Sequence, residues 1–238
     1  MPLFTPSVLI SDCWGSMGDI TFFHRDGKCY YKNKPHGAFT GTAGQLASLD
    51  VHRRALAAWR TVPHEMQKIW NTLAEPVISH KPPFDGTAHI SGQNLFVSAY
   101  HGFTTLGYEH CPTPKPFEPF PPHSVAFFDA SRSDASSLLL RFQTFFPDGV
   151  NGSRYQLLVK VQLAKPGCGK KPGLMRNFLA SAPCSNGDGT ACVLVDDFIA
   201  RWGLDMDEYQ VHCQYVLLDR ETGYRNNLTP LSFSIKLS

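Results

Sequence analysis

Residues 209–238 have the sequence YQVHCQYVLLDRETGYRNNLTPLSFSIKLS, in which two β-rich runs, 209–219 and 230–238, flank a polar stretch. The polar stretch contains Thr222-Gly223, which is a turn signal because glycine adopts backbone conformations that other residues avoid. We therefore expect the two runs to form the closing antiparallel strand pair of a β domain.

Four further β-rich runs precede this pair: SVAFFDA, SLLLRFQTFF, RYQLLVKVQLA and ACVLVDDF, beginning at residues 124, 137, 154 and 191. Turn signals separate them, among them Asp148-Gly149, Asn151-Gly152, Asn186-Gly187 and Asp188-Gly189. About six strands in about 115 residues predict an antiparallel sandwich of the immunoglobulin or fibronectin kind. The stretches SSLLL (136–140) and DDFIARWG (196–203) could instead form short helices, which would make this half α+β.

A proline-rich stretch, YEHCPTPKPFEPFPPH at 108–123, contains six prolines and marks the clearest boundary in the chain. Prolines remove backbone donors and favour a stiff, extended segment, so we interpret it as a linker or as an arm lying on a neighbour. The expected division is a hairpin and helical module at 1–107, the linker or arm at 108–123, and the β-sandwich at 124–238. The fold class is therefore α+β.

In the N-terminal module, residues 18–34 (GDITFFHRDGKCYYKNK) predict a β-hairpin, because Asp-Gly suits a two-residue hairpin turn. Pairing outward from Asp26-Gly27 fixes which residues share a face. One face is mostly apolar, and the other is aromatic and cationic. The apolar face would carry Ile20, Phe22, His24, Cys29, Tyr31 and Asn33; the cationic face would carry Thr21, Phe23, Arg25, Lys28, Tyr30 and Lys32.

Three helices should follow the hairpin and cover its apolar face. The first runs from about Thr42 to Arg60, with Thr42 and Gln45 as a capping box. The second starts near Pro63, and the third runs from about Ser91 to a stop at Gly107. Two tryptophans, Trp59 and Trp70, are most simply core anchors of the helical part.

The charge of the chain is nearly balanced, with a formal net charge of +2 over 238 residues. Residues 1–107 carry 9 Lys or Arg against 7 Asp or Glu, and residues 124–238 carry 12 against 11. This balance argues against a protein whose main partner is nucleic acid. We expect no signal peptide and no transmembrane segment, and therefore a soluble, intracellular chain.

Three apparent chemical motifs are weak. The stretch AKPGCGKK (164–171) resembles a phosphate-binding loop, but Lys171 replaces the Ser or Thr that would ligate Mg²⁺, so a basic loop between strands is the better interpretation. The ten histidines show no zinc-ligand spacing, and the seven cysteines show no regular pattern. A disulfide between Cys184 and Cys192 is a minor alternative to reduced thiols. We predict no catalytic residue, cofactor or metal.

The N-terminal half resembles a family of uncharacterised phage-, prophage- and Bacteroidota-associated proteins. The resemblance spans about residues 15–106 and rests on the order of three elements: GSMGDITFFHRDGKCYYKNKP, then TAGQLASLDVHRRALAAWRTVPHEMQKIWNTLA, then SGQNLFVSAY. The chain departs from the usual pattern at Pro63, where Thr or Asp is common, and at HGAFTG (36–41), where an Asn-Pro turn is common. The resemblance implies that the gene lies among genes for virion-structure and tail proteins, and it implies no particular chemistry.

These observations predict a non-enzymatic structural or adaptor protein, a capsid or tail component that contacts other virion proteins and forms homo-oligomers, with no membrane partner. Aromatic side chains and arginine are enriched at protein interfaces. The alternative is a nucleic-acid-binding protein that uses the same hairpin with the first helix, and a weaker one is an enzyme with an unfamiliar site. The expected contact residues are Arg25, Lys28, Tyr30, Lys32, Lys34, Arg53 and Arg54.

Overall fold

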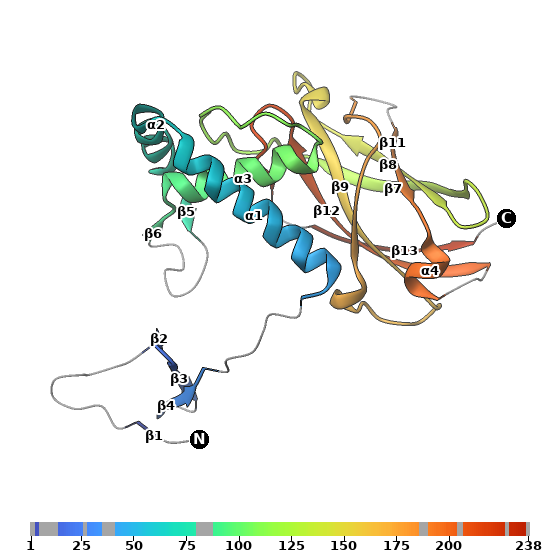
Figure 1. The fold of residues 1–238 in the computed structure, drawn as a ribbon. Coiled ribbons are helices and arrows are strands. Elements are labelled where there is room, and N and C mark those ends of the chain that lie inside the picture. The colour runs from blue at the N-terminus through green and yellow to red at the C-terminus, as the bar shows by residue number, and fades with distance from the viewer. Residues whose placement is uncertain are drawn as a thin grey trace. The chain divides into compact units, whose positions relative to one another are not determined.

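The structure of the chain is a computed structural model, and it describes residues 3–4, 14–25, 28–34, 41–79, 88–185, 190–203, 207–226 and 229–236. Spatial clustering divides the chain into two compact units, Met1–Ala47 and Ser48–Ser238, which are described separately below (Figure 1). The domain boundaries expected after residues 107 and 123 remain predictions.

The first unit contains a four-stranded antiparallel sheet with the strand order β1-β4-β3-β2. Its pairing confirms the predicted hairpin register, because Phe22 lies opposite Tyr31 and Phe23 lies opposite Tyr30. The turn residues Asp26 and Gly27 lie outside the described residues. The strands are β1 (Leu3–Phe4), β2 (Gly15–Met17), β3 (Ile20–Arg25) and β4 (Lys28–Asn33).

Local capping signals set the beginnings of two helices as predicted. Before α1 (Ala43–Thr61), the Thr42 backbone N–H donates to Gln45 Oε1 at 2.9 Å, and the Gln45 N–H donates to Thr42 Oγ1 at 3.4 Å. These two bonds are the reciprocal pair of a capping box. Ser91 caps α3 (Gly92–Thr105) by accepting from the Asn94 N–H at 3.3 Å.

The other helix ends also follow from the sequence. The second helix, α2 (His64–Ala74), begins one residue after Pro63, which occupies the N-cap position. Gly107, with φ of +79°, ends α3 in a left-handed conformation that favours glycine. A short antiparallel pair, β5 (Ile78–Ser79) and β6 (Ala88–His89), lies between α2 and α3 in the sequence.

The helices pack around an aromatic core. Phe96 and Trp70 are almost fully buried and meet edge to face with ring centroids 5.5 Å apart. Trp59 lies against Phe96 at 5.3 Å. Both tryptophans are therefore core anchors, as predicted, because each fills space between helices instead of facing solvent.

The C-terminal part is an antiparallel immunoglobulin-like β-sandwich, whose described residues form seven strands in two sheets. The first, second and fifth strands form one sheet in the order β11-β8-β7, and the others form the second sheet in the order β10-β9-β12-β13. Relative to the constant-type immunoglobulin arrangement, only the fourth strand changes sheet. The strands are β7 (Ser124–Arg132), β8 (Leu138–Phe145), β9 (Tyr155–Ala164), β10 (Arg176–Leu179), β11 (Thr190–Val195), β12 (Glu208–Asp219) and β13 (Thr229–Lys236).

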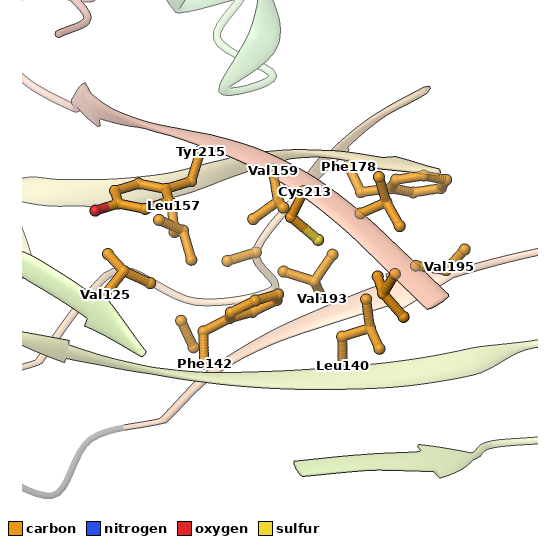
Figure 2. Packing of buried hydrophobic residues seen from close by; sticks show 14 of the residues in the cluster. Val125, Leu140, Phe142, Leu157, Val159, Phe178, Val193, Val195, Cys213 and Tyr215 are labelled. Carbon is orange, nitrogen blue, oxygen red and sulfur yellow. The ribbon is translucent and has the colours of Figure 1, made fainter. Parts of the chain in front are cut away.

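Alternating side chains from the two sheets meet to form the sandwich core. Figure 2 shows Leu140 and Phe142 of β8 pointing toward Val159 of β9 and Cys213 of β12. Each of these four side chains is at most 2% exposed. The alternation along β8 follows from the two-residue period of a strand, which sends every second side chain into the space between the sheets.

For the C-terminal half, the structure adds one strand to the prediction and decides between alternatives that the sequence left open. All six expected runs form strands, and β10 is an additional strand. The stretch DDFIARWG forms a short helix, α4 (Phe198–Trp202), whereas SSLLL leads into β8. Two 3-10 helices, Gly152–Arg154 and Pro172–Leu174, precede β9 and β10.

The proline-rich segment forms no helix or strand and lies against the sandwich. The Tyr224 hydroxyl donates to the Lys115 carbonyl at 3.0 Å, and the Phe117 and Tyr224 rings are 5.6 Å apart. Phe120 lies 5.6 Å from Tyr155 at the start of β9. Because its prolines already restrict the backbone, the segment can hold these contacts at a low cost in conformational entropy.

The turn between β12 and β13 begins with a buried ion pair. Arg154 donates to Asp219 Oδ2 from Nε at 3.0 Å and from Nη2 at 2.7 Å, and from Nη1 to Glu118 at 2.8 Å. The Asp219 side chain is 7% exposed, whereas that of Glu118 is 58% exposed. The guanidinium therefore joins the start of β9, the end of β12 and the proline-rich segment.

The same turn packs tightly against α3. Gly223, with φ of +73°, places its backbone against Gly102 and Ala99 of the helix. A Cβ atom on Gly102 would overlap the Gly223 carbonyl, so the approach requires glycine at this helix position.

Asp219→Asn should lower the free energy of unfolding by about 3 kcal/mol, because it leaves a half-buried guanidinium without its main counter-charge. The matched control, Glu118→Gln, removes an exposed partner of the same guanidinium and should cost less than about 1 kcal/mol. Urea denaturation of both variants measures the difference. Equal losses for the two would contradict the account.

Gly102→Ala should destabilise the chain by about 1–3 kcal/mol, because helix and turn must separate to admit the methyl group. Gly173 has no atom within 4 Å of a built Cβ, so Gly173→Ala should change stability by less than about 0.5 kcal/mol. Thermal unfolding followed by circular dichroism compares them. A Gly102→Ala protein as stable as wild type would rule out the close contact.

Candidate partner-binding site

The cationic face of the β3–β4 hairpin is the candidate site that the sequence predicted. Phe23 and Tyr30 lie opposite each other, and their rings stack with centroids 5.9 Å apart and an interplanar angle of 23°. Lys32 Nζ lies 5.6 Å from the centre of the Phe23 ring, within reach of a cation–π interaction. The result is an aromatic pair with an ammonium group above one ring.

The charged residues of this face are open to solvent. Arg25, Lys28, Lys32 and Lys34 are exposed, and Tyr30 is half-buried. Lys34 is fixed at its backbone, where its N–H donates to the Asp19 carbonyl at 2.6 Å. Their role in binding remains a prediction, but the register places Arg25, Lys28, Tyr30 and Lys32 on one face as expected.

The opposite face of the hairpin is apolar. Cys29 is only 5% exposed, and Phe22 and Tyr31 lie 6.4 Å apart. At the edge of the sheet, Met17 is 72% exposed, and Trp14 is 68% exposed while stacking on His24 at 5.8 Å. Sequence analysis did not single out these two residues, although an exposed Trp and Met are both common at interfaces.

The remaining two predicted contact residues, Arg53 and Arg54, lie on α1 within Ser48–Ser238. Both are exposed, and Arg54 Nε donates to Asp50 at 3.0 Å one helical turn earlier. The hairpin belongs to the other compact unit, Met1–Ala47. Their membership of one common surface with the hairpin therefore stays a prediction.

A small cavity of about 190 Å³ lies between α1, α3 and the start of the proline-rich segment. Phe103 meets the rings of Tyr108 and His110 edge to face at 5.3 and 5.1 Å, and the latter two rings stack at 5.4 Å. The volume is below the roughly 300–1,000 Å³ typical of small-molecule sites. The lining residues are Arg54, Tyr100, Phe103, Thr104, Tyr108, Glu109 and His110.

Two histidines meet between α1 and α3, where the His52 and His101 rings are 5.8 Å apart. Burial is the main cause that lowers the pKa of His101 below its ordinary value of 6.5, and the neighbouring His52 and Arg225 lower it further. His101 therefore resists protonation in the folded chain. The unfolded chain binds the proton more readily.

The chain should consequently lose stability as the pH falls through about 6.5, because below that value the unfolded state binds more protons than the folded state. His101→Gln should flatten this dependence, as measured by urea denaturation between about pH 7.5 and pH 5. An identical pH profile for wild type and His101→Gln would show that this histidine does not cause the effect.

Within the described residues, no three His, Cys, Asp or Glu side chains converge as metal ligands would. The stretch 164–171 is the last residue of β9 and the connection toward its antiparallel neighbour β10, and not the strand-to-helix connection of a nucleotide-binding P-loop. Cys184 and Cys192 are free thiols. Burial raises the pKa of Cys184 to about 11, although a hydrogen bond with Thr144 opposes it, and burial raises that of Cys213 to about 12.

No protein-family model and no curated protein matches the chain. Of the described helices, none combines the length and apolar character needed to cross a bilayer.

Solved structures with distant similarity include AggA, the major subunit of aggregative adherence fimbriae type I from Escherichia coli. It is 9% identical over 49% of this chain and 95% of that chain, with a TM-score of 0.28. A domain of the outer membrane lipoprotein Omp28 from Porphyromonas gingivalis is 11% identical over 48% and 88%, with a TM-score of 0.25. A conjugate transposon protein from Bacteroides vulgatus is 12% identical over 50% and 88%, with a TM-score of 0.23. At such scores these similarities do not bear on function.

Proposed function

We propose that this chain is a non-enzymatic structural or adaptor protein, a capsid or tail component of a phage or prophage virion that binds other assembly proteins and copies of itself. The observation that carries the proposal is the exposed face of the hairpin. There, the Phe23–Tyr30 pair lies among Arg25, Lys28 and Lys32. Aromatic rings and arginine are enriched at protein interfaces, and the rings bury a large area with few rotatable bonds.

Two edge strands of the sandwich, β7 and β13, have features that hinder the addition of a strand from another protein. The edge strand β7 carries an irregularity between Phe127 and Asp129, and the edge strand β13 contains Pro230, which has no backbone N–H. Bulges and prolines are devices that prevent another strand from pairing with a sheet edge. The aromatic surface of the hairpin is thus the better candidate for assembly contacts.

Resemblance of residues 15–106 to phage- and prophage-associated proteins supports the virion assignment, which also places the chain in the virion or the host cytoplasm. A second candidate, binding of nucleic acid by the hairpin with Arg53 and Arg54, is favoured by the stacked Phe23–Tyr30 pair, since such pairs can also hold unpaired bases. Against that role, Arg54 is already paired with Asp50, and the common surface of Arg53 and Arg54 with the hairpin stays a prediction.

To test the proposal, a lysogen is supplied with the wild-type chain or with one of two triple variants. Mass spectrometry then measures how much of each chain is present in the purified particles. The hairpin variant is Arg25→Gln/Lys28→Gln/Lys32→Gln. The matched control, Lys165→Gln/Lys170→Gln/Lys171→Gln, removes the same charge from the sandwich. We expect the hairpin variant to be incorporated about tenfold less than the other two, which corresponds to the loss of about 1.4 kcal/mol of contact energy.

Absence of the wild-type chain from particles while it is abundant in the lysate would overturn the virion assignment. Equal incorporation of both variants would overturn the assignment of the hairpin as the contact surface. Light scattering of the purified wild-type chain adds a further check, since we expect oligomers, and a strict monomer would count against self-association.

A further inference from the structure

The balanced charge of the sandwich conceals a strongly basic segment. Residues 160–177, KVQLAKPGCGKKPGLMRN, contain five cations and no Asp or Glu. The other residues of 124–238 carry 7 Lys or Arg against 11 Asp or Glu. Positive charge is therefore concentrated at one place on the sandwich. The four lysines of this segment, called the basic loop surface below, are Lys160, Lys165, Lys170 and Lys171. Arg176 lies opposite the core residue Val161 in the register and therefore belongs to the other side of the sheet.

The backbone of this segment is anchored to the second sheet. The Lys171 N–H donates to Gln162 Oε1 at 2.7 Å, and Gln162 is itself 2% exposed. His212 Nε2 donates to the Cys168 carbonyl at 2.8 Å, and the Cys168 N–H donates to the Lys165 carbonyl at 3.0 Å. These bonds hold the loop over the sheet, so its cations are positioned before a partner arrives.

The turn at Pro172–Leu174, which follows the loop, is held by hydrogen bonds from Trp202 and Arg176. Trp202 Nε1 donates to the Leu174 carbonyl at 2.9 Å, and Arg176 Nη1 donates to the Gly173 and Met175 carbonyls, both at 2.9 Å. Ordering a loop before binding lowers the entropy lost on association.

The lysines of the surface have no carboxylate partner among the described residues. Lys165, Lys170 and Lys171 are exposed, Lys160 is half-exposed, and none forms an ion pair there. The nearby start of β12 contains Asp207 and Glu208, and Glu208 lies opposite Lys236 of β13 in the strand register.

The sheet face under the loop is mainly polar, and it carries the carboxylate of Glu208 only at the start of β12, where this residue lies opposite Lys236 in the register. The register places the side chains of alternate residues on the same outward face, opposite the buried core positions. These residues are mainly uncharged hydrogen-bonding groups: Asn177, Gln162, Gln210, His212, Gln214, Ser232 and Ser234.

We propose that the basic loop surface binds the sugar–phosphate backbone of double-stranded nucleic acid without reading its sequence. Lysine supplies point charges for phosphates, and amide or hydroxyl side chains and backbone N–H groups are the other common phosphate-binding groups. Residues 160–177 include no aromatic side chain on which an unpaired base could stack. A duplex therefore fits this surface better than a single strand.

Fluorescence anisotropy with a labelled duplex of about 30 base pairs tests the proposal, using the full chain and the two triple variants defined above. With about four phosphate contacts, wild-type affinity should fall about a hundredfold between about 50 and about 200 mM salt. Lys165→Gln/Lys170→Gln/Lys171→Gln should reduce the slope of log K against log salt by about 2 to 3. The double variant Arg60→Gln/Lys68→Gln changes exposed cations outside both candidate surfaces and should bind within about threefold of wild type. Loss of binding by the hairpin variant alone would assign the site to the hairpin and overturn the proposal.

A charge-preserving variant, Lys165→Arg/Lys170→Arg/Lys171→Arg, should restore binding, and circular dichroism establishes that every variant is folded. The proposal fails if wild type does not bind duplex at the lower salt, or if the loop variant binds as tightly as wild type. Preference for a single-stranded oligonucleotide, for phosphatidylserine vesicles or for polyglutamate would also overturn it, each by identifying a different class of partner.

Discussion

The ion pair between Arg154 and Asp219 ties together segments that are far apart in the sequence. Asp219 ends β12 and accepts two hydrogen bonds from the guanidinium, while its other oxygen accepts from the Glu221 N–H at 2.9 Å. Asp219 chiefly raises the pKa of Arg154, opposed in part by desolvation, so the positive charge persists at any ordinary pH. The Asp219 backbone also accepts from the Gly223 N–H at 2.8 Å and donates to the Tyr224 carbonyl at 2.8 Å, so this residue fixes the start of the β12–β13 turn through both its side chain and its backbone.

From the turn, contacts extend to the proline-rich segment and to the helices. Tyr224 reaches the carbonyl of Lys115, and Gly223 lies against the backbone of α3. Burial, followed by the charge of Asp219, raises the pKa of Tyr224, so its hydroxyl remains a donor. The helices and the sandwich are thus connected through a few buried contacts at one end of the sandwich.

Local features of the structure could be predicted from the sequence, whereas contacts between distant segments could not. Asp26-Gly27 was sufficient to predict the register of β3 and β4, and Thr42, Gln45 and Ser91 predicted the caps, because each signal acts over a few residues. The contact of Gly102 with Gly223 joins residues about 120 positions apart. The sequence around either glycine does not indicate which distant residue it contacts. β10 was not predicted because its four residues, Arg176–Leu179, are too few to show the two-residue alternation of a strand.

The two candidate surfaces differ in how the sequence indicates them. The hairpin face was visible because alternation sorts Arg25, Lys28 and Lys32 onto one side of a predicted strand pair. The sequence indicated only a basic loop between strands at 164–171, because charge averaged over 124–238 nearly cancels and no local signal marks the sheet that holds the loop. Its significance follows from Gln162 and His212, which anchor the loop through contacts across the sheet.

The central claim is that the turn at Asp219–Tyr224 makes α3 and the sandwich one cooperative unit. Native-state amide hydrogen exchange of the full chain tests it most directly, because exchange reports the opening free energy of each segment. We expect the buried amides of α3, such as those of Ala99 and Phe103, to open with the same free energy as those of β12. Opening of α3 at a free energy several kcal/mol lower, as for an independent helical domain, would contradict the claim.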